Sequence, residues 1–413
     1  MRIKLDLGLI SAIASLAFSL CAYAGDSGRT LFRVINLGDP GGGAISQGTS
    51  NNQPGWTAGF STLPDFTMHA ELWSGGGAKS LGTLGGPNSA VAWPNRNDHG
   101  VIVGIAETAK MQPLGEQWSC YLAVFYVGDG RVCRGFVWRD GVMSALPTLG
   151  GDNGFATGVN NRGQIVGWAE NTVHDPTCGE FTNNSQTLQF EAVMWVRDGD
   201  HARDGDHYRP IELAPYPGDL DGAATAINQR GQVVGISGIC DGAIGGATAE
   251  HMVMWRHGRV VRQLPTLGGA YWNTPMDINN QGDVVGFSDQ PGDGPTGGQA
   301  NFQAFFWSAR SFTCNGKMTP RGSTCDLGTL SGDAVSEALA VNDRNQVVGV
   351  SYPSGHAFLW QDGKMTDLNA LVAPGTALVL TDAQDINDRG VITGQAKDPT
   401  TNATVAFEAI PVR

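Results

Sequence analysis

The chain has 413 residues and a formal net charge of −13 at pH 7, with 39 acidic and 26 basic side chains. A surface of this sign repels phosphate groups, so it disfavours nucleic acid and anionic membranes as partners. Glycine supplies 59 residues and only 16% of the chain is charged, which disfavours long helices and disorder and favours an all-β fold rich in turns.

The first 24 residues have the pattern of a secretory signal peptide: a short basic start, an apolar run from Leu7 to Leu20, and small residues before the expected cleavage after Ala24. The apolar run is shorter than the roughly 20 residues that a membrane-spanning helix needs, which disfavours a retained anchor. We therefore expect no membrane insertion and a mature protein, residues 25–413, that is secreted or periplasmic.

Seven copies of one motif follow this segment. The clearest column is an Asn seven residues before a Gly, with β-branched residues just ahead of the Gly, as in NQRGQVVG at 228–235. The Asn positions are Asn52, Asn97, Asn160, Asn228, Asn279, Asn342 and Asn387. Because Asn and Gly tolerate positive φ, the Asn-x-x-Gly step predicts a tight turn between two strands.

Two further columns recur between these turns. One is an apolar pentad, usually closed by Trp, at 69–73, 134–138, 191–195, 251–255, 303–307, 356–360 and, without Trp, at 405–409. The other resembles TLGG, at 80–86, 145–151, 263–269 and 326–332 and less well kept at 34–42, 211–218 and 366–375. Each unit therefore offers four strands: the pentad, the segment ending in TLGG, the run into the Asn and the strand after the turn.

The two ends of the chain favour a closed ring over an open solenoid. The N-terminal copy starts at VINLG (34–38) and lacks its pentad, and the missing pentad is VAFEA (405–409) near the C-terminus. A ring gains a shared blade from this arrangement, and closure hides sheet edges. We predict a single domain, a seven-bladed β-propeller with four antiparallel strands per blade, whose C-terminal strand completes the N-terminal blade begun by residues 31–61.

The combined pattern resembles the HAF-repeat family of bacterial proteins. The pentad HAFLW (356–360), the following G-x-M-x-DL, the TLGG segment and the NDRGQVVG-like strand carry this resemblance, which covers nearly all of residues 31–413. The first copy departs from the pattern, and insertions interrupt it around 108–133, 171–190, 197–209 and 308–325. The resemblance implies secretion and repeats, and it implies no particular activity.

Two recurring positions have alternative interpretations. Six pentads end in Trp, and the same position in six blades favours packing between blades over a sugar-stacking ladder. The first pentad position holds His69, Arg134, Glu191, His251, Gln303, His356 and Val405. These residues would share one surface, conceivably the axial channel, where the three histidines could bind a metal. Hydrogen-bonded strand ends are the favoured alternative.

Six cysteines remain after the signal peptide, and an even number in an exported chain predicts disulfides. They are Cys120, Cys133, Cys178, Cys240, Cys314 and Cys325. The first two and the last two each fall within one insertion, which predicts local pairs. The middle two follow equivalent strands of neighbouring units, so they could bridge adjacent blades. The absence of CxxC spacing makes zinc the weaker interpretation.

One insertion carries a cluster of acids. Asp198, Asp200, Asp204 and Asp206 lie close together in sequence, and oxygen ligands on a loop suit calcium. Their spacing is not that of an EF-hand loop, so a solvated acidic insertion is favoured. We expect no cofactor, with calcium at these residues as the alternative.

The sequence contains no GxSxG elbow, HExxH helix, Walker loop or dinucleotide fingerprint. Aromatic residues outside the repeat pattern favour a binding role, because such side chains are enriched at interfaces; they are Trp118, Tyr121, Tyr216, Tyr271, Trp272 and Tyr352. We predict a monomeric, non-catalytic binding scaffold for an extracellular glycan or protein. The alternative is an extracellular polysaccharide hydrolase or lyase with acids at the channel mouth, such as Glu191 and an Asp, because glycoside cleavage needs two carboxyl groups flanking the bond.

Overall fold

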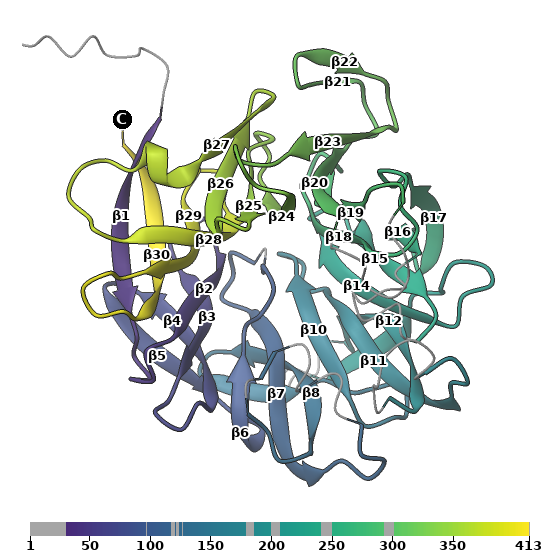
Figure 1. Ribbon diagram of the computed structural model, residues 1–413. Helices are drawn as coiled ribbons and strands as arrows, with labels where there is room; N and C mark the ends of the chain where they lie inside the picture. The colour runs from purple at the N-terminus through teal and green to yellow at the C-terminus, as the bar shows by residue number, and fades with distance from the viewer. Residues whose placement is uncertain are drawn as a thin grey trace, which may run out of the picture.

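The computed structural model describes residues 30–95, 97–116, 120, 124–125, 127–178, 186–199, 207–240, 250–292 and 301–412. These residues form seven four-stranded antiparallel sheets around a central axis, and a small hairpin of β21 (Phe312–Cys314) and β22 (Lys317–Thr319) (Figure 1). The predicted seven-bladed β-propeller is confirmed. In this part of the chain no helix is long and apolar enough to cross a membrane.

In blades 1 to 6 the strands follow one another in chain order from the axis outward, whereas blade 7 takes its outermost strand from the N-terminal part of the chain. The first strands of most neighbouring blades contact one another, which places them at the axis. The inner strands of blades 1 to 7 are β2 (Ser46–Asn51), β6 (Gly85–Ala90), β10 (Gly154–Val159), β14 (Asp221–Ile227), β18 (Asn273–Ile278), β24 (Val335–Val341) and β28 (Val379–Ile386). The second strands are β3 (Thr57–Thr62), β7 (Ile102–Met111), β11 (Ile165–His174), β15 (Val233–Gly238), β19 (Val284–Asp289), β25 (Val347–Tyr352) and β29 (Ile392–Lys397).

The third and fourth strands form the outer half of each blade. The third strands are β4 (Met68–Ser74), β8 (Arg131–Arg139), β12 (Leu188–Arg197), β16 (His251–Arg256), β20 (Phe302–Trp307), β26 (His356–Gln361) and β30 (Thr404–Val412). The outer strands are β5 (Gly77–Gly82), β9 (Val142–Ala145), β13 (Tyr208–Glu212), β17 (Arg259–Leu264), β23 (Thr324–Gly328), β27 (Lys364–Asp367) and, in blade 7, β1 (Leu31–Gly38).

The sequence unit and the structural blade differ in phase. The run into the Asn is the inner strand, the strand after the turn is the second, the pentad is the third, and the segment ending in TLGG supplies the outer strand and the connection to the next blade. A unit counted from its pentad therefore spans two blades. Of residues 31–61, only β1 joins the C-terminal strands, whereas β2 and β3 belong to blade 1.

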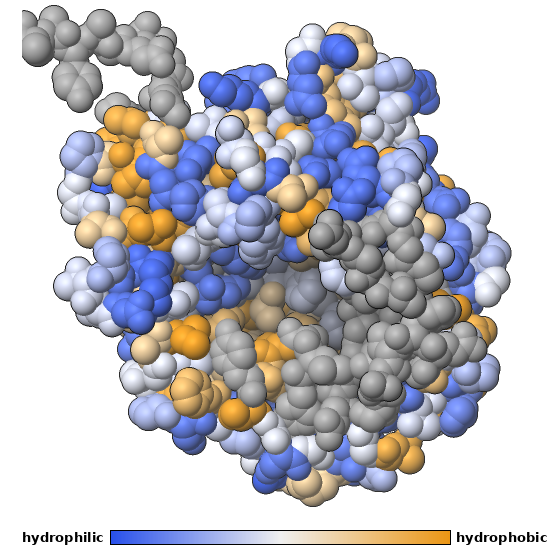
Figure 2. Space-filling view, viewed as in Figure 1, coloured by the Kyte–Doolittle hydropathy of each residue, from blue (hydrophilic) through white to orange (hydrophobic). Residues whose placement is uncertain are grey.

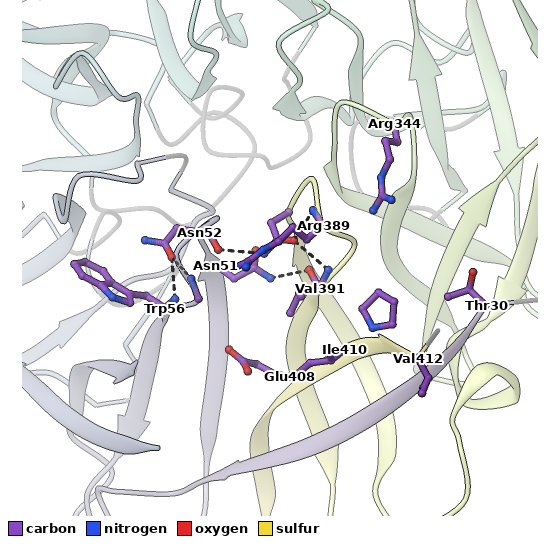
Figure 3. A pocket seen from close by; sticks show the side chains of 13 residues that line it. Thr30, Asn51, Asn52, Trp56, Arg344, Arg389, Val391, Glu408, Ile410 and Val412 are labelled. Atoms are coloured by element: carbon purple, nitrogen blue, oxygen red, sulfur yellow. Dashed lines mark hydrogen bonds between the residues drawn. The ribbon is translucent and has the colours of Figure 1, made fainter. Parts of the chain in front are cut away.

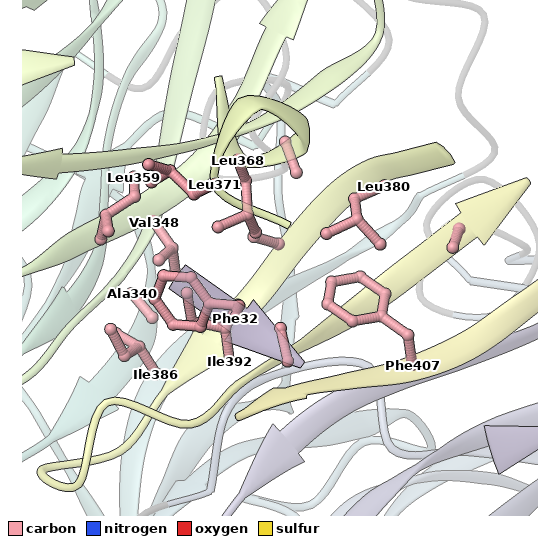
Figure 4. Packing of buried hydrophobic residues seen from close by; sticks show 14 of the residues in the cluster. Phe32, Ala340, Val348, Leu359, Leu368, Leu371, Leu380, Ile386, Ile392 and Phe407 are labelled. Atoms are coloured by element: carbon pink, nitrogen blue, oxygen red, sulfur yellow. The ribbon is translucent and has the colours of Figure 1, made fainter. Parts of the chain in front are cut away.

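Blade 7 closes the ring by pairing the two ends of the chain. Strand β1 runs antiparallel to β30, with Leu31 opposite Val412 and Gly38 opposite Ala406. Phe32 is 1% exposed and lies in an apolar cluster between blades 6 and 7 that includes Val348, Leu368 and Ile392 (Figure 4). The predicted closure by the C-terminal strand is confirmed, and Phe32 anchors the strand that completes it.

The recurring Asn residues form a hydrogen-bonded ring. In each turn the Asn Oδ1 accepts two backbone N–H groups of its own turn, as Asn228 does from Arg230 and Gln232 at 3.0 and 3.1 Å. Its Nδ2 donates to the backbone oxygen of the corresponding Asn in the next blade, over distances from 2.8 to 3.3 Å in all seven turns. The Asn thus shapes its own turn and also links neighbouring blades.

The pentad tryptophans pack between blades, as predicted. All six are buried: Trp73, Trp138, Trp195, Trp255, Trp307 and Trp360. Each faces the preceding blade, as shown by the Nε1 atoms of Trp195 and Trp255, which donate at 2.7 Å to backbone oxygens of Pro147 and Ala214 after blades 2 and 3. These rings are core residues and do not form a sugar-stacking ladder.

All three predicted disulfides are present. Cys120 pairs with Cys133 and Cys314 with Cys325, each within one insertion. Cys178 pairs with Cys240 and joins the ends of β11 and β15, in blades 3 and 4. Together they cross-link one pair of adjacent blades and two local loops.

Candidate functional site

The ring has two chemically different ends. We call the end with the Asn turns the turn face. We call the other end the loop face; it carries the connections from second to third strands and those from each outer strand to the next blade. The ring is hollowed at its centre (Figure 2). Because loops held on a rigid scaffold are the usual carriers of binding residues, the loop face is the first place to look for a site.

The structure brings the sequence-predicted aromatic residues that it describes onto the loop face. Tyr216 stacks on His251, with ring centroids 4.1 Å apart, and Trp272 packs against Phe302 at 5.3 Å. Tyr271 is half-buried beside Trp272. Trp118 and Tyr121 lie outside the described residues. Two of the rings are thus engaged with neighbouring rings.

Tyr352 is different because it is 39% exposed at the end of β25. Glu337 of β24 and Asp382 of β28 are close enough to act on it, since their charges together with burial raise the pKa of Tyr352. Both acids lie in inner strands, five residues before the turn Asn, and therefore in the half of the strand nearest the loop face. An exposed ring and two carboxyl groups meet at the inner edge of blades 6 and 7.

The pKa values of both acids are raised toward neutral pH. Burial, followed by the charge of Asp382, raises the pKa of Glu337 to about 7. Burial raises the pKa of Asp382 to about 6, against a hydrogen bond from Gln384 that lowers it. The other oxygen of Asp382, Oδ1, is buried without a hydrogen-bond partner among the described residues. The pair can therefore donate as well as accept hydrogen bonds near pH 7.

Sequence reasoning missed Glu337 and Asp382. The signal was present in the column five residues before each turn Asn, where blades 6 and 7 carry acids and the other blades carry Gln47, Ala92, Phe155, Ala223 and Thr274. Two acids in the same column of adjacent blades must lie near each other in a propeller.

Glu191, the acid that the sequence proposed for glycoside cleavage, belongs to a different cluster with Asp175 and Asp221. Burial, followed by a hydrogen bond with Asp175, raises the pKa of Asp221 to about 10. All three carboxyl groups are buried. A substrate does not reach acids in this position, so the Glu191 pair is not a catalytic site as the structure stands.

The first pentad residues do not line the axial channel, which corrects that hypothesis. They lie in third strands, two strands outward from the axis. His251 Nδ1 lies 2.8 Å from Asp219 Oδ2, and His356 Nδ1 lies 2.9 Å from Asp367 Oδ2, while His69 is in a third blade. The described residues contain no group of three or more potential ligands placed to hold a metal ion. Hydrogen-bonded strand ends fit His251 and His356.

The acidic insertion is described only in part. Asp198 is exposed and lies 3.7 Å from Arg209, whereas Asp200, Asp204 and Asp206 lie outside the described residues. A solvated insertion, with calcium binding as its alternative, stays a prediction.

No family model matches the chain, and no curated protein matches it. Among solved structures it is similar to an acylaminoacyl peptidase from Pyrococcus horikoshii, at 11% identity and a TM-score of 0.43 over 92% of this chain and 52% of the peptidase. It is also similar to a sialidase from Trypanosoma rangeli, at 10% identity and a TM-score of 0.37 over 82% and 56% of the two chains. The chain spans about half the length of either protein, and similarity this low carries no argument about activity.

Proposed function

We propose that this propeller is an extracytoplasmic, non-catalytic binding protein that holds a glycan on its loop face, around Tyr352, Glu337 and Asp382. The observation that carries the proposal is the exposed ring of Tyr352 beside two carboxyl groups whose pKa values are raised toward neutral pH. An aromatic face covers the apolar side of a sugar ring, and nearby polar groups hydrogen-bond its hydroxyls. The three disulfides support a function in an oxidising compartment.

A second candidate is hydrolysis of an extracellular polysaccharide by the same two acids. It is favoured by their pKa values of about 7 and about 6, because a glycosidase needs one protonated and one ionised carboxyl group at the same pH. Binding is favoured over hydrolysis because Asp382 Oδ1 is buried, which keeps this oxygen away from a sugar carbon.

A glycan array combined with product analysis tests both candidates. We expect saturable binding without new reducing ends, and we expect Tyr352→Ala to weaken it at least tenfold. Met318→Ala is the matched control, because Met318 is a large exposed apolar residue of β22, away from the loop-face site. New reducing ends that disappear in Glu337→Gln would establish the hydrolase instead. Unchanged binding by Tyr352→Ala would rule out this site.

A further inference from the structure

A pocket of about 590 Å³ opens on the turn face where the last blade meets the first. Residues from blades 1, 6 and 7 line it, and Trp56 and Arg344 lie on opposite sides of it, with Arg389 and Glu408 between them (Figure 3). A neighbouring recess of about 260 Å³, lined in part by Trp73, shares Gly55 and Glu408 with it. We call the contact between blades 7 and 1 the closing seam.

The pocket exists because polar residues replace apolar ones at the closing seam. The fourth pentad position is apolar in six blades and is Glu408 in the seventh; the six are Leu72, Val137, Met194, Met254, Phe306 and Leu359. The residue five positions after the turn Asn is likewise β-branched and apolar in six blades and is Thr57 in blade 1. At other seams these two positions pack in one apolar cluster, as Met254 does with Val284.

At the closing seam the corresponding contact is a hydrogen bond. Thr57 Oγ1 donates to Glu408 Oε1 at 2.6 Å. The two substitutions therefore match each other across the seam, and they place a carboxyl group where the other seams are filled with side-chain carbon. Glu408 and Thr57 are both polar at positions that are apolar in the other six blades. The polar character is therefore shared by the two blades that meet at this seam.

Asn51 adds an unsatisfied acceptor to the same pocket. It occupies a position that is Val159, Ile227, Ile278, Val341 or Ile386 in five other blades. Its backbone N–H donates to Asp385 at 2.8 Å and its Nδ2 to the Val391 oxygen at 2.9 Å, both across the seam. Its side chain is 6% exposed, and Oδ1 has no hydrogen-bond partner among the described residues. A buried acceptor without a donor is costly, so Asn51 adds to the polarity of the closing seam and not to its packing.

Two guanidinium groups also line the pocket. Arg389 is exposed and donates from Nη2 to the Gln53 oxygen across the seam. Arg344 is exposed on the turn of blade 6. Its Nη2 lies against Gly390 of blade 7, only 2.6 Å from the position that a Cβ would take there. On a protein of net charge −13, two arginines beside one pocket form a local anion-binding pair, because the planar guanidinium matches a carboxylate in geometry.

From this arrangement we propose that the closing-seam pocket binds a sugar unit bearing a carboxylate, such as a uronic acid of an acidic glycan. Arg344 and Arg389 receive the carboxylate, and Glu408 accepts sugar hydroxyls. Trp56 bounds the pocket at blade 1, and its ring packs toward Gly100 of blade 2. The site is on the face opposite Tyr352 and does not rest on the loop-face function.

The test uses the full mature chain and a glucuronate-containing oligosaccharide as probe, with its neutral glucose counterpart as comparison, measured by titration calorimetry. We expect saturable binding of the uronate probe, at least tenfold weaker binding of the neutral one, and at least a tenfold loss in Arg389→Gln. The matched control is Arg162→Gln, at the same turn position in blade 3, where it lies against Gly231. It should bind like the wild type.

A second variant restores apolar packing at the closing seam, so its effect on binding does not depend on destabilising the fold. The double substitution Thr57→Val with Glu408→Leu restores the residues typical of the other blades, so it should raise the melting temperature and abolish binding of the uronate probe. Three results overturn the proposal: no saturable binding by the wild type, equal binding of the neutral probe, or full binding by the repaired variant. Tyr352→Ala should leave uronate binding unchanged, which separates this site from the loop-face site.

Discussion

Replacing Phe32 with alanine tests whether the N-terminal strand holds the ring closed. Phe32 is 1% exposed and lies in the cluster between blades 6 and 7, and truncating a buried Phe to Ala costs about 3–5 kcal/mol of unfolding free energy. Its neighbour Leu31 is 40% exposed, because successive side chains of a strand point to opposite faces. Leu31→Ala should therefore cost no more than about 0.5 kcal/mol.

Denaturant unfolding followed by tryptophan fluorescence measures both variants against the wild type. Strand β1 is the outer strand of blade 7, and the backbone oxygen of Phe32 also accepts a hydrogen bond from the Ala373 N–H at 2.8 Å. Removing the Phe32 ring should therefore loosen this strand as well as create a cavity. Proteolysis should then cut Phe32→Ala near residues 30–45 before the wild type is cut. Equal stability of the two variants would refute the role of Phe32 in closure.

Three further predictions follow from closure, cross-linking and buried charge. Deleting residues 404–413 removes β30, the partner of both β1 and β29, and should lower the melting temperature of the whole ring; a truncated chain that melts like the full one would contradict the closed propeller. Replacing Cys178 and Cys240 with serine should cost about 2–4 kcal/mol in denaturant unfolding, and an unchanged midpoint would argue against a role for this bridge between blades. The folded pKa of Glu337, about 7, lies above the ordinary Glu value of 4.5, so the folded state binds the proton more tightly and stability should fall as pH rises from about 4.5 to about 7. Glu337→Gln should flatten this slope, and an unchanged slope would show that Glu337 does not cause it.

The fold was predictable because the Asn that shapes each turn recurs in all seven copies. An Asn that accepts two N–H groups of its own turn and donates to the next blade leaves little freedom for substitution, so the column is easy to recognise. The phase of the blade was not predictable in the same way. The order of strands from the axis outward depends on which strands pair. The pentad pattern identifies a buried strand, but it does not indicate whether that strand is the first or the third of its blade.

The candidate sites were less predictable because they depend on departures from the repeat. Tyr352 was identified from the sequence as an aromatic residue outside the repeat pattern. Glu337 and Asp382 were not identified, because a single acid is not a distinctive signal in a chain with 39 acidic residues. At the closing seam, Glu408 was visible only as part of a pentad that had lost its Trp. Its contact with Thr57 joins residues near opposite ends of the chain, and only the closed ring brings them together.

The two sides of blade 7 have opposite chemistry, and the way the ring closes accounts for this. Closure occurs inside blade 7, where β1 pairs with β30, so the strand that completes the ring must be held by packing toward blade 6, and Phe32 and its apolar neighbours supply that packing. On the opposite side of the same blade, the hydrogen bond from Thr57 to Glu408 takes the place of the apolar pair that fills the other seams. The polar pocket at this seam therefore leaves the packing of Phe32 toward blade 6 intact.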